Sequence, residues 1–421
     1  MNKRNISVIA FSICLAALLC TICVDAYCDE FRFAQIDEYV AQTPAGAEKS
    51  LDILAEYLSK PACSDVEKAR AIYSWITHNI DFDPETYTSG DYGDQSPEKI
   101  LETRLAVCGG YGNFFNALAK RMGLESVMIE GYSRGKGYRA GSTFDKYDHA
   151  WNAVKIDGSW RLLDCIWGAG YVDNDNKFIR KPRDHYFLTN PQEFIYDHFP
   201  ENSAWQLLDK PLTKSEFELL VYIRPAFFGN RLKLISHTQG VINCTGTCNV
   251  ELETPDDVLL KAEVDRGDTK VPGASVFVQR DASHVAVNAV LPSAGEYILR
   301  LYTKHADDPG NYEWAADYCV RASSQGNNKT FPTVFETFHQ RNAHLYQPMC
   351  GSLKSGSTEI FKISAPEAVA VAVIIDGKWT NLQKIGNVFE GQALIRGNEV
   401  QVAAMFPGNR KYLVLLKYTV T

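Results

Sequence analysis

The sequence of 421 residues lacks several features that would point to particular classes of function. Beyond the N-terminal run from Ile6 to Val24, no segment has the ~18 uninterrupted apolar residues that a membrane-spanning helix requires. A basic excess is also missing, since the formal net charge at pH 7 is −8. Proteins that recognise nucleic acids usually present a basic face. We therefore expect no nucleic-acid partner and no membrane contact beyond the N-terminal segment.

Residues 1–26 have the pattern of a cleavable export signal. Lys3 and Arg4 precede the apolar run, and the segment Val24–Ala26 offers small or apolar residues at the cleavage positions. The run is also close in length to a short membrane span, so an uncleaved anchor is the alternative. No cysteine there follows the small residue of a lipid-attachment site. We predict a secreted or extracytoplasmic protein, periplasmic if the host is bacterial.

A zinc-ligand pattern is missing as well. Cys244 and Cys248 have a suggestive spacing, but no second pair of cysteines or histidines lies at a matching separation. In an oxidising compartment, a small disulfide loop is the better interpretation of these two residues. We expect no metal and no organic cofactor.

The two halves of the mature chain differ in pattern. Residues 27–212 mix helical and strand periodicities, and Ser64 to Glu67 form a capping box at the start of one helix. Short alternating strand patterns then fill residues 226–322 and 331–421, with the polar linker "SSQGNNKT" between them. We predict an α+β domain followed by two all-β sandwich modules.

The stretch "AVCGGYGNFF" places one cysteine at the beginning of a helical pattern. From Cys108 the apolar positions recur with helical spacing, and Gly123 supplies a stop signal. Unpaired amides and the positive end of the helix dipole favour a thiolate at Cys108. A lone cysteine before two glycines can equally be a structural thiol, so this stretch alone does not decide between the two.

A predicted hairpin supplies partners for such a thiol. Asp157-Gly158 between two strand patterns indicates a two-residue turn, which would place Trp151 opposite Asp164. His149 would then lie diagonal to Asp164 on the same face, within reach of a long side chain. Cys165, one residue further along the strand, would point to the opposite face. A thiol, an imidazole and a carboxylate are the groups that a cysteine nucleophile requires.

Four segments, "VCGGYGNFFNALAKRMG", "GYSRGKGYRAG", "DHAWNAVKIDGSWRLLD" and "WGAG", resemble the transglutaminase-like superfamily. They are most similar to its branch typified by kyphoscoliosis peptidase and hillarin. The resemblance implies a papain-like cysteine-enzyme core with Cys108 as nucleophile, His149 as general base and acid, and Asp164 as the orienting residue. It also implies immunoglobulin-like β modules. One departure is Cys165, because a threonine commonly follows the aspartate in that family.

Other candidate residues lie near these positions in sequence. Trp151 would form a wall of the site or a part of the core. Three basic residues of a glycine-rich loop would bind an acidic substrate or remain solvated: Arg134, Lys136 and Arg139. His185 and His198 have no partner that the sequence indicates, so we expect surface or packing roles for both.

The predicted activity is thiolate attack on peptide or side-chain amide carbonyls of a protein or peptide substrate, followed by hydrolysis. Transfer to an amine, which would crosslink proteins, is one alternative. The other is a non-catalytic binding or scaffolding protein with a relic triad, whose β modules bind protein or glycan.

The remaining cysteines allow a disulfide hypothesis. If Cys108 and Cys165 stay free, six cysteines are left in the mature chain, an even number suited to an oxidising compartment. Proximity in sequence suggests three pairs: Cys28 with Cys63, Cys244 with Cys248, and Cys319 with Cys350.

Overall fold

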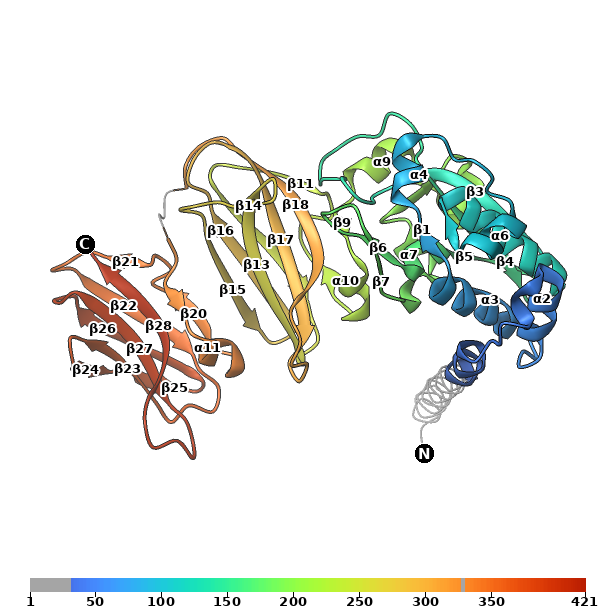
Figure 1. The fold of residues 1–421 in the computed structure, drawn as a ribbon. Coiled ribbons are helices and arrows are strands. Elements are labelled where there is room, and N and C mark those ends of the chain that lie inside the picture. The colour runs from blue at the N-terminus through green and yellow to red at the C-terminus, as the bar shows by residue number, and fades with distance from the viewer. Residues whose placement is uncertain (1–31, 327–329) are drawn as a thin grey trace, which may run out of the picture. The chain divides into compact units, whose positions relative to one another are not determined.

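A computed structural model describes residues 32–326 and 330–421 (Figure 1). The predicted export signal and Cys28 lie outside these residues. The described chain forms two compact units. The first comprises residues 32–136 and 144–213, and the second comprises residues 137–143 and the chain from residue 214 onward.

The first unit has mixed helical and strand structure. Its helices are η1 (Ala47–Lys49), α2 (Leu51–Ser59), α3 (Asp65–Asn79), α4 (Pro84–Ser89), α5 (Pro97–Thr103), α6 (Cys108–Arg121), α7 (Cys165–Ala169), η2 (Asp184–Tyr186), α8 (Pro191–Phe194) and η3 (Ser203–Gln206). Its strands are β1 (Asp81–Phe82), β2 (Leu105–Ala106), β3 (Ser126–Ser133), β4 (His149–Ile156), β5 (Ser159–Leu163), β6 (Gly170–Val172), β7 (Phe178–Arg180) and β8 (His198–Pro200).

The start of α3 follows the predicted capping pattern. The Ser64 hydroxyl accepts a hydrogen bond from the Glu67 amide at 3.3 Å. The Glu67 carboxylate accepts from the Cys63 amide at 2.6 Å, one residue before the cap. These bonds satisfy amides that the helix itself leaves unpaired.

A four-stranded antiparallel sheet in the order β5-β4-β3-β8 carries helix α6 on one face. The helix buries Phe114 and Phe115, and Phe114 stacks on Trp75 of α3 with ring centroids 5.6 Å apart. This apolar layer fixes α6 against β3 and β4, and so sets the position of Cys108 relative to the sheet.

The predicted hairpin register is confirmed. Ile156 pairs with Ser159, and both turn residues have positive φ, +48° at Asp157 and +80° at Gly158. The strand ends at Leu163, however, and Asp164 caps helix α7. The prediction that Cys165 continues the strand was therefore wrong. Cys165 is the first residue of α7 and is buried in the helical core of the unit.

The second unit contains two β-sandwich modules. The first module comprises α9 (Lys214–Leu219), β9 (Tyr222–Ile223), α10 (Pro225–Gly229), β10 (Lys233–Leu234), β11 (Val241–Cys244), β12 (Thr247–Glu253), β13 (Val258–Arg266), β14 (Thr269–Lys270), β15 (Ser275–Asp281), β16 (His284–Val290), β17 (Gly295–His305) and β18 (Glu313–Ala322). Its two sheets have the orders β10-β12-β16-β15 and β11-β18-β17-β13-β14, with β9 added on β18.

The second module has the same two-sheet construction. It comprises β19 (Thr333–Val334), α11 (Glu336–Gln340), β20 (His344–Gln347), β21 (Ser352–Leu353), β22 (Thr358–Ser364), β23 (Ala370–Ile375), β24 (Lys378–Asn381), β25 (Gln383–Ile385), β26 (Val388–Leu394), β27 (Glu399–Met405) and β28 (Leu413–Val420). Its sheets have the orders β19-β28-β27-β23-β24 and β20-β22-β26-β25, with β21 added on β28.

The predicted pairs Cys244–Cys248 and Cys319–Cys350 do not form, since these four cysteines are free. The Cys28–Cys63 pair stays a prediction, because Cys28 lies outside the described residues. Cys244 lies on β11 and Cys248 on β12, and these strands belong to different sheets of the sandwich. Cys319, on β18, is fully buried. The backbone at Gly141 packs against it, since a Cβ placed on Gly141 would lie 3.3 Å from the Cys319 sulfur. Closeness in sequence was therefore a poor guide to pairing.

No helix in the described part of the chain is both long and apolar enough to cross a bilayer.

Candidate active site

Cys108 occupies the first position of α6 and is partly exposed. Its two neighbouring glycines have different roles. A Cβ on Gly110 would lie 2.4 Å from the side-chain oxygen of Gln95, which accepts a hydrogen bond from the Val107 amide at 3.0 Å. A Cβ on Gly109 would meet nothing within 4 Å. Because position 110 has no side chain, the loop that carries Gln95 can approach the start of the helix, whereas a side chain on Gly109 would face open space.

The structure brings His149 and Asp164 together. His149 Nε2 lies 2.7 Å from Asp164 Oδ2, and both residues are buried. The other carboxylate oxygen, Asp164 Oδ1, accepts hydrogen bonds from the amides of Ile166 and Trp167 at 2.8 and 3.0 Å. Both oxygens of the carboxylate are therefore fixed, one by the start of α7 and the other by the imidazole.

Electrostatics favour a charged pair at this point. Burial alone would lower the pKa of His149, but the charge and hydrogen bond of Asp164, followed by those of Cys108, raise it to about 10. Burial would raise the pKa of Asp164, but His149 and His198 hold it well below its usual range. Because Nε2 faces Asp164, Nδ1 is the ring nitrogen left to face the Cys108 sulfur. Cys108, His149 and Asp164 are thus the candidate catalytic residues, with the thiol close enough to the imidazole to affect its pKa.

His198 is a site residue that the sequence did not indicate. Its Nε2 lies 3.0 Å from Asp164 Oδ2, and its Nδ1 lies 2.6 Å from Asp197 Oδ1. The ring stacks on Phe194 with centroids 4.0 Å apart and is 1% exposed. The surface alternative was therefore wrong for His198, and its contact with two carboxylates goes beyond the packing role that we expected.

The sheet explains how two histidines reach one carboxylate. On β3, Gly131 pairs with His149 of β4 on one side and with Pro200 of β8 on the other. His198, two residues from Pro200, points to the same face of the sheet as His149. A Cβ on Gly131 would lie 2.6 Å from a ring carbon of Trp151, so only glycine fits at this point between β4 and β8.

Aromatic rings surround this face. Trp151 is 1% exposed, and its ring lies 6.0 Å from that of His149 and 5.0 Å from that of His198. It lines the buried side of the site. Trp167, on α7, is less buried and lies 5.3 Å from His149. Trp167 therefore borders the more open side, a role that the sequence did not assign to it.

The three basic residues of the loop do not form one surface. Arg134 is 0% exposed, and its backbone amide donates to the Asp197 carbonyl at 2.9 Å. Lys136 Nζ donates to Asn176 at 3.0 Å. Arg139 belongs to the second unit and lies 3.7 Å from Asp268. In this arrangement, Arg134 is closed to a substrate side chain.

Tyr87, a residue of α4, lies close to Asp148 and Cys108. Its hydroxyl donates to the carbonyl of Asp148 at 3.4 Å, directly before His149. Burial, followed by the charges of Asp148 and Cys108, raises the pKa of Tyr87 to about 12. The ring is 40% exposed, so Tyr87 combines closeness to the thiol with access to solvent. Nothing in the sequence pattern indicated this residue.

Two family models match this chain. Residues 52–165 match the family model of the transglutaminase-like superfamily, and residues 214–333 match that of the KY-like, immunoglobulin-like domain. The chain carries a transglutaminase-like domain. The fold is this domain followed by a KY-like immunoglobulin-like domain and a second β sandwich.

Curated relatives contain the same region. The chain is 31% identical over 342 residues to human (Homo sapiens) kyphoscoliosis peptidase, an alignment covering 80% of this chain and 49% of the relative. Identity to hillarin of Drosophila melanogaster is 32% over 249 residues, covering 55% of this chain and 30% of hillarin. The Lim and transglutaminase domain protein ltd-1 of Caenorhabditis elegans is 35% identical over 221 residues, covering 49% and 30%. The chain thus spans half or less of the length of these relatives.

The match to the transglutaminase-like domain contains Cys108, His149 and Asp164 and ends at residue 165. It does not reach His198 or Asp197. These two residues extend the charged arrangement beyond the part of the chain that the superfamily model describes.

His149, Asp164 and His198 are also residue types that bind metals. Their ligand atoms lie within 4.8 Å of one another. Both Nε2 atoms, however, lie at hydrogen-bond distance from the same carboxylate oxygen, at 2.7 and 3.0 Å. A cation at this point would have to replace both of these hydrogen bonds. We therefore assign the three residues to a hydrogen-bonded arrangement.

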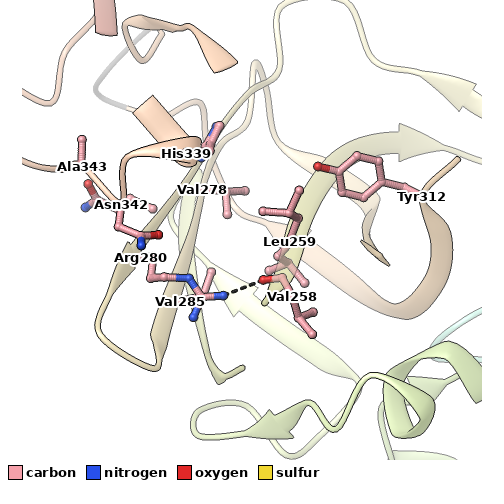
Figure 2. A pocket seen from close by; sticks show the side chains of 11 residues that line it. Val258, Leu259, Val278, Arg280, Val285, Tyr312, His339, Asn342 and Ala343 are labelled. Carbon is pink, nitrogen blue, oxygen red and sulfur yellow. Dashed lines mark hydrogen bonds between the residues drawn. The ribbon is translucent and has the colours of Figure 1, made fainter. Parts of the chain in front are cut away.

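A small cavity in the second unit offers no competing site (Figure 2). Its volume is about 40 Å³, enough for water but not for a substrate group. Arg280 extends into it and donates to the Val258 carbonyl at 2.6 Å and to Thr254 Oγ1 at 2.5 Å. Its guanidinium is therefore occupied by the protein's own oxygens.

Proposed function

We propose that this protein is a thiol enzyme that hydrolyses amide bonds of a protein or peptide. The observation that carries the proposal is the position of His149, which is bonded to Asp164 at 2.7 Å and interacts with Cys108 at the start of α6. Exposure of Cys108, with open space at Gly109, supports access for an extended substrate. The name of the human relative, kyphoscoliosis peptidase, supports a peptide or protein substrate.

In the first half of the reaction, the Cys108 sulfur would act as the nucleophile and the His149 imidazolium as the acid. The Cys108 thiolate attacks the amide carbon, and a carbon–sulfur bond forms while the carbonyl oxygen takes the negative charge. Amides of the first turn of α6 have no intrahelical acceptor and can donate to this oxygen. The carbon–nitrogen bond then breaks, and the leaving nitrogen takes the proton of the His149 imidazolium. A thioester on Cys108 and a neutral His149 remain.

Water would complete the cycle. Neutral His149 takes a proton from water, and the hydroxide attacks the thioester carbon. The carbon–sulfur bond breaks, which releases a carboxylic acid and restores the thiolate and the imidazolium. A primary amine in place of water would give a new amide, so the same intermediate could also serve crosslinking. Asp164 keeps the imidazole in place through both halves.

Alkylation of the native protein tests the proposal. Mass spectrometry after brief treatment with an iodoacetamide probe should show Cys108 modified much faster than Cys63, an exposed free thiol that serves as the internal control. His149→Ala should slow the reaction at Cys108 and leave Cys63 unchanged. Equal rates at the two thiols would contradict the enzyme. A peptide assay with water alone and with an added primary amine would then distinguish hydrolysis from crosslinking.

Export is part of the same proposal. The signal pattern over residues 1–26 supports action outside the cytosol. Fractionation of the native host, with detection of the chain in the extracytoplasmic fraction and determination of its N-terminus, would test this. Retention of the full chain in the cytosol would contradict it.

A further inference from the structure

The Cys-His-Asp arrangement continues into a second buried pair. Asp164 Oδ2 accepts from His149 at 2.7 Å and lies 3.0 Å from His198 Nε2. On the other side of the ring, His198 Nδ1 lies 2.6 Å from Asp197 Oδ1. The Tyr186 hydroxyl donates a hydrogen bond to Asp197 Oδ2 at 3.1 Å. A series of hydrogen-bonded side chains therefore extends from His149 through Asp164 and His198 to Asp197 and Tyr186.

The partners of His198 determine its protonation. Both ring nitrogens face carboxylates, and an ionised carboxylate can only accept hydrogen bonds. Two hydrogen bonds of this kind require a proton on each nitrogen, which makes His198 an imidazolium. The exposed fractions are 1% for His198, 1% for Asp164 and 3% for Asp197. A neutral ring here would leave two buried carboxylates with less compensation, at a high cost in free energy.

Its surroundings are consistent with a cation. Burial alone would lower the pKa of His198, but the charge of Asp197 and the hydrogen bonds to both aspartates raise it. Other groups that face the ring are His149, with centroids 5.4 Å apart, and the aromatic rings of Phe194, Trp151 and Trp167. Arg134 adds a buried positive charge nearby, since its amide donates to the Asp197 carbonyl. Burial raises the pKa of Tyr196, and the charge of Arg134 partly opposes this rise.

We propose that His198 is a positioning residue: a fixed imidazolium that acts through Asp164 to set the proton affinity of His149. This inference rests on the proposed function. His198 forms and breaks no bond in the reaction. It shares the negative charge of Asp164 and repels a second positive charge on His149. Without it, His149 would hold its proton more tightly and give it up less readily to the leaving amine.

The separation gives the size of the effect. At 5.4 Å between the two rings, a unit charge in a medium of effective dielectric constant ~20 moves a pKa by roughly two pH units. Because Asp164 lies between the rings and screens part of this interaction, we expect a shift of about one to two pH units in His149.

The first test needs no substitution at His198. In Cys108→Ala, the pKa of His149 should fall into an accessible range, because the sulfur that helps to raise it is gone. Nuclear magnetic resonance of the ¹⁵N-histidine-labelled variant should show His198 protonated at both nitrogens at neutral pH, because the pKa of the ring is raised by its two aspartate partners. A single protonated nitrogen on His198 at neutral pH would overturn the proposal.

Two further substitutions in the same Cys108→Ala background test the effect on His149. His198→Gln removes the cation and should raise the titration midpoint of His149 by about one to two pH units. Asp197→Asn should act in the same direction, because it weakens the hold of His198 on its second proton. Asp317→Asn is the matched control, since Asp317 is also 3% exposed and lies in the other unit. It should leave the His149 midpoint unchanged.

These readouts separate the inference from the proposed function. Slow alkylation of Cys108 in the unsubstituted protein would contradict the enzyme and would leave the histidine titrations to decide the role of His198. An unchanged His149 midpoint in a folded His198→Gln variant would overturn the inference, even where Cys108 reacts rapidly. If His198→Gln does not fold, the protonation of His198 in the Cys108→Ala protein decides the matter alone.

Discussion

The Asn152 side-chain nitrogen lies 3.0 Å from the side-chain oxygen of Asn116 and 3.1 Å from the carbonyl of Gly112. Asn152 is on β4, three residues after His149, whereas Asn116 and Gly112 are on α6, the helix that begins with Cys108. One buried amide therefore joins the strand of the imidazole to the helix of the thiol.

Asn152→Ala should weaken this connection. We expect a loss of about 1–3 kcal/mol in the free energy of unfolding, because the Gly112 carbonyl and the Asn116 amide lose a buried partner. Alkylation of Cys108 should slow as well, since α6 would lose its register on the sheet. Urea unfolding and alkylation rates measure the two effects. Asn249→Ala is the control, because it removes a similar Asn–Asn bond, to Asn288 at 3.0 Å, in the second unit. It should not slow the reaction of Cys108.

The two glycines after Cys108 should respond in opposite ways to alanine. Gly110→Ala would place a Cβ 2.4 Å from Gln95 Oε1 and 3.1 Å from the Ala106 Cβ, so we expect a loss of about 1–3 kcal/mol in stability. Gly109→Ala meets no neighbour and should stabilise the helix by up to about 1 kcal/mol. Thermal or urea unfolding of the two variants gives the comparison. Equal effects would mean that the Gln95 contact does not hold the helix start.

Part of this site could be predicted from the sequence because it depends on local signals. Asp157-Gly158 specifies a tight turn, and the turn alone fixes which residues of β4 and β5 are opposite each other. The pairing of His149 with Asp164 follows from that register. The start of α6 was similarly visible, since its apolar face has helical spacing over the whole element.

His198 was not predictable in this way. It lies on a strand of three residues within an irregular aromatic segment, too short to show an alternating pattern. Its partnership with Asp164 depends on β8 returning to the edge of β3, which is a long-range contact. Asp164 shows a different limit. An aspartate is a favoured helix cap, and this signal competed with the strand pattern that had been extended to Cys165.

The charge of His149 should make stability depend on pH in the alkaline range. Its pKa in the folded chain is about 10, above its ordinary value of about 6.5, so the folded state binds this proton more tightly than the unfolded state. The resulting stabilisation is complete below about pH 6.5 and is lost as the pH rises to about 10.

Urea unfolding midpoints across this range measure the effect. His149→Gln serves as the reference, because subtraction removes the contributions of the titrating groups that do not interact with His149. We expect the difference between the two proteins to shrink as the pH rises. A difference that stays constant from about pH 6 to about pH 10 would mean that His149 is neutral in the folded chain.

Asp164 has two roles that substitution can separate. Oδ1 accepts from the amides of Ile166 and Trp167, whereas Oδ2 faces the imidazoles of His149 and His198. Asp164→Asn can keep the cap through its amide oxygen while it loses the charge. We expect amide hydrolysis to fall by about 10²–10⁴, because a neutral amide does not stabilise an imidazolium. Stability should fall as well, because two buried imidazoles lose the carboxylate charge that they share. Asp164→Ala should lose the cap as well, and so about 1 kcal/mol of stability beyond the asparagine variant. Turnover and unfolding measured on both variants distinguish the roles, and near-normal turnover in Asp164→Asn would remove its charge from the mechanism.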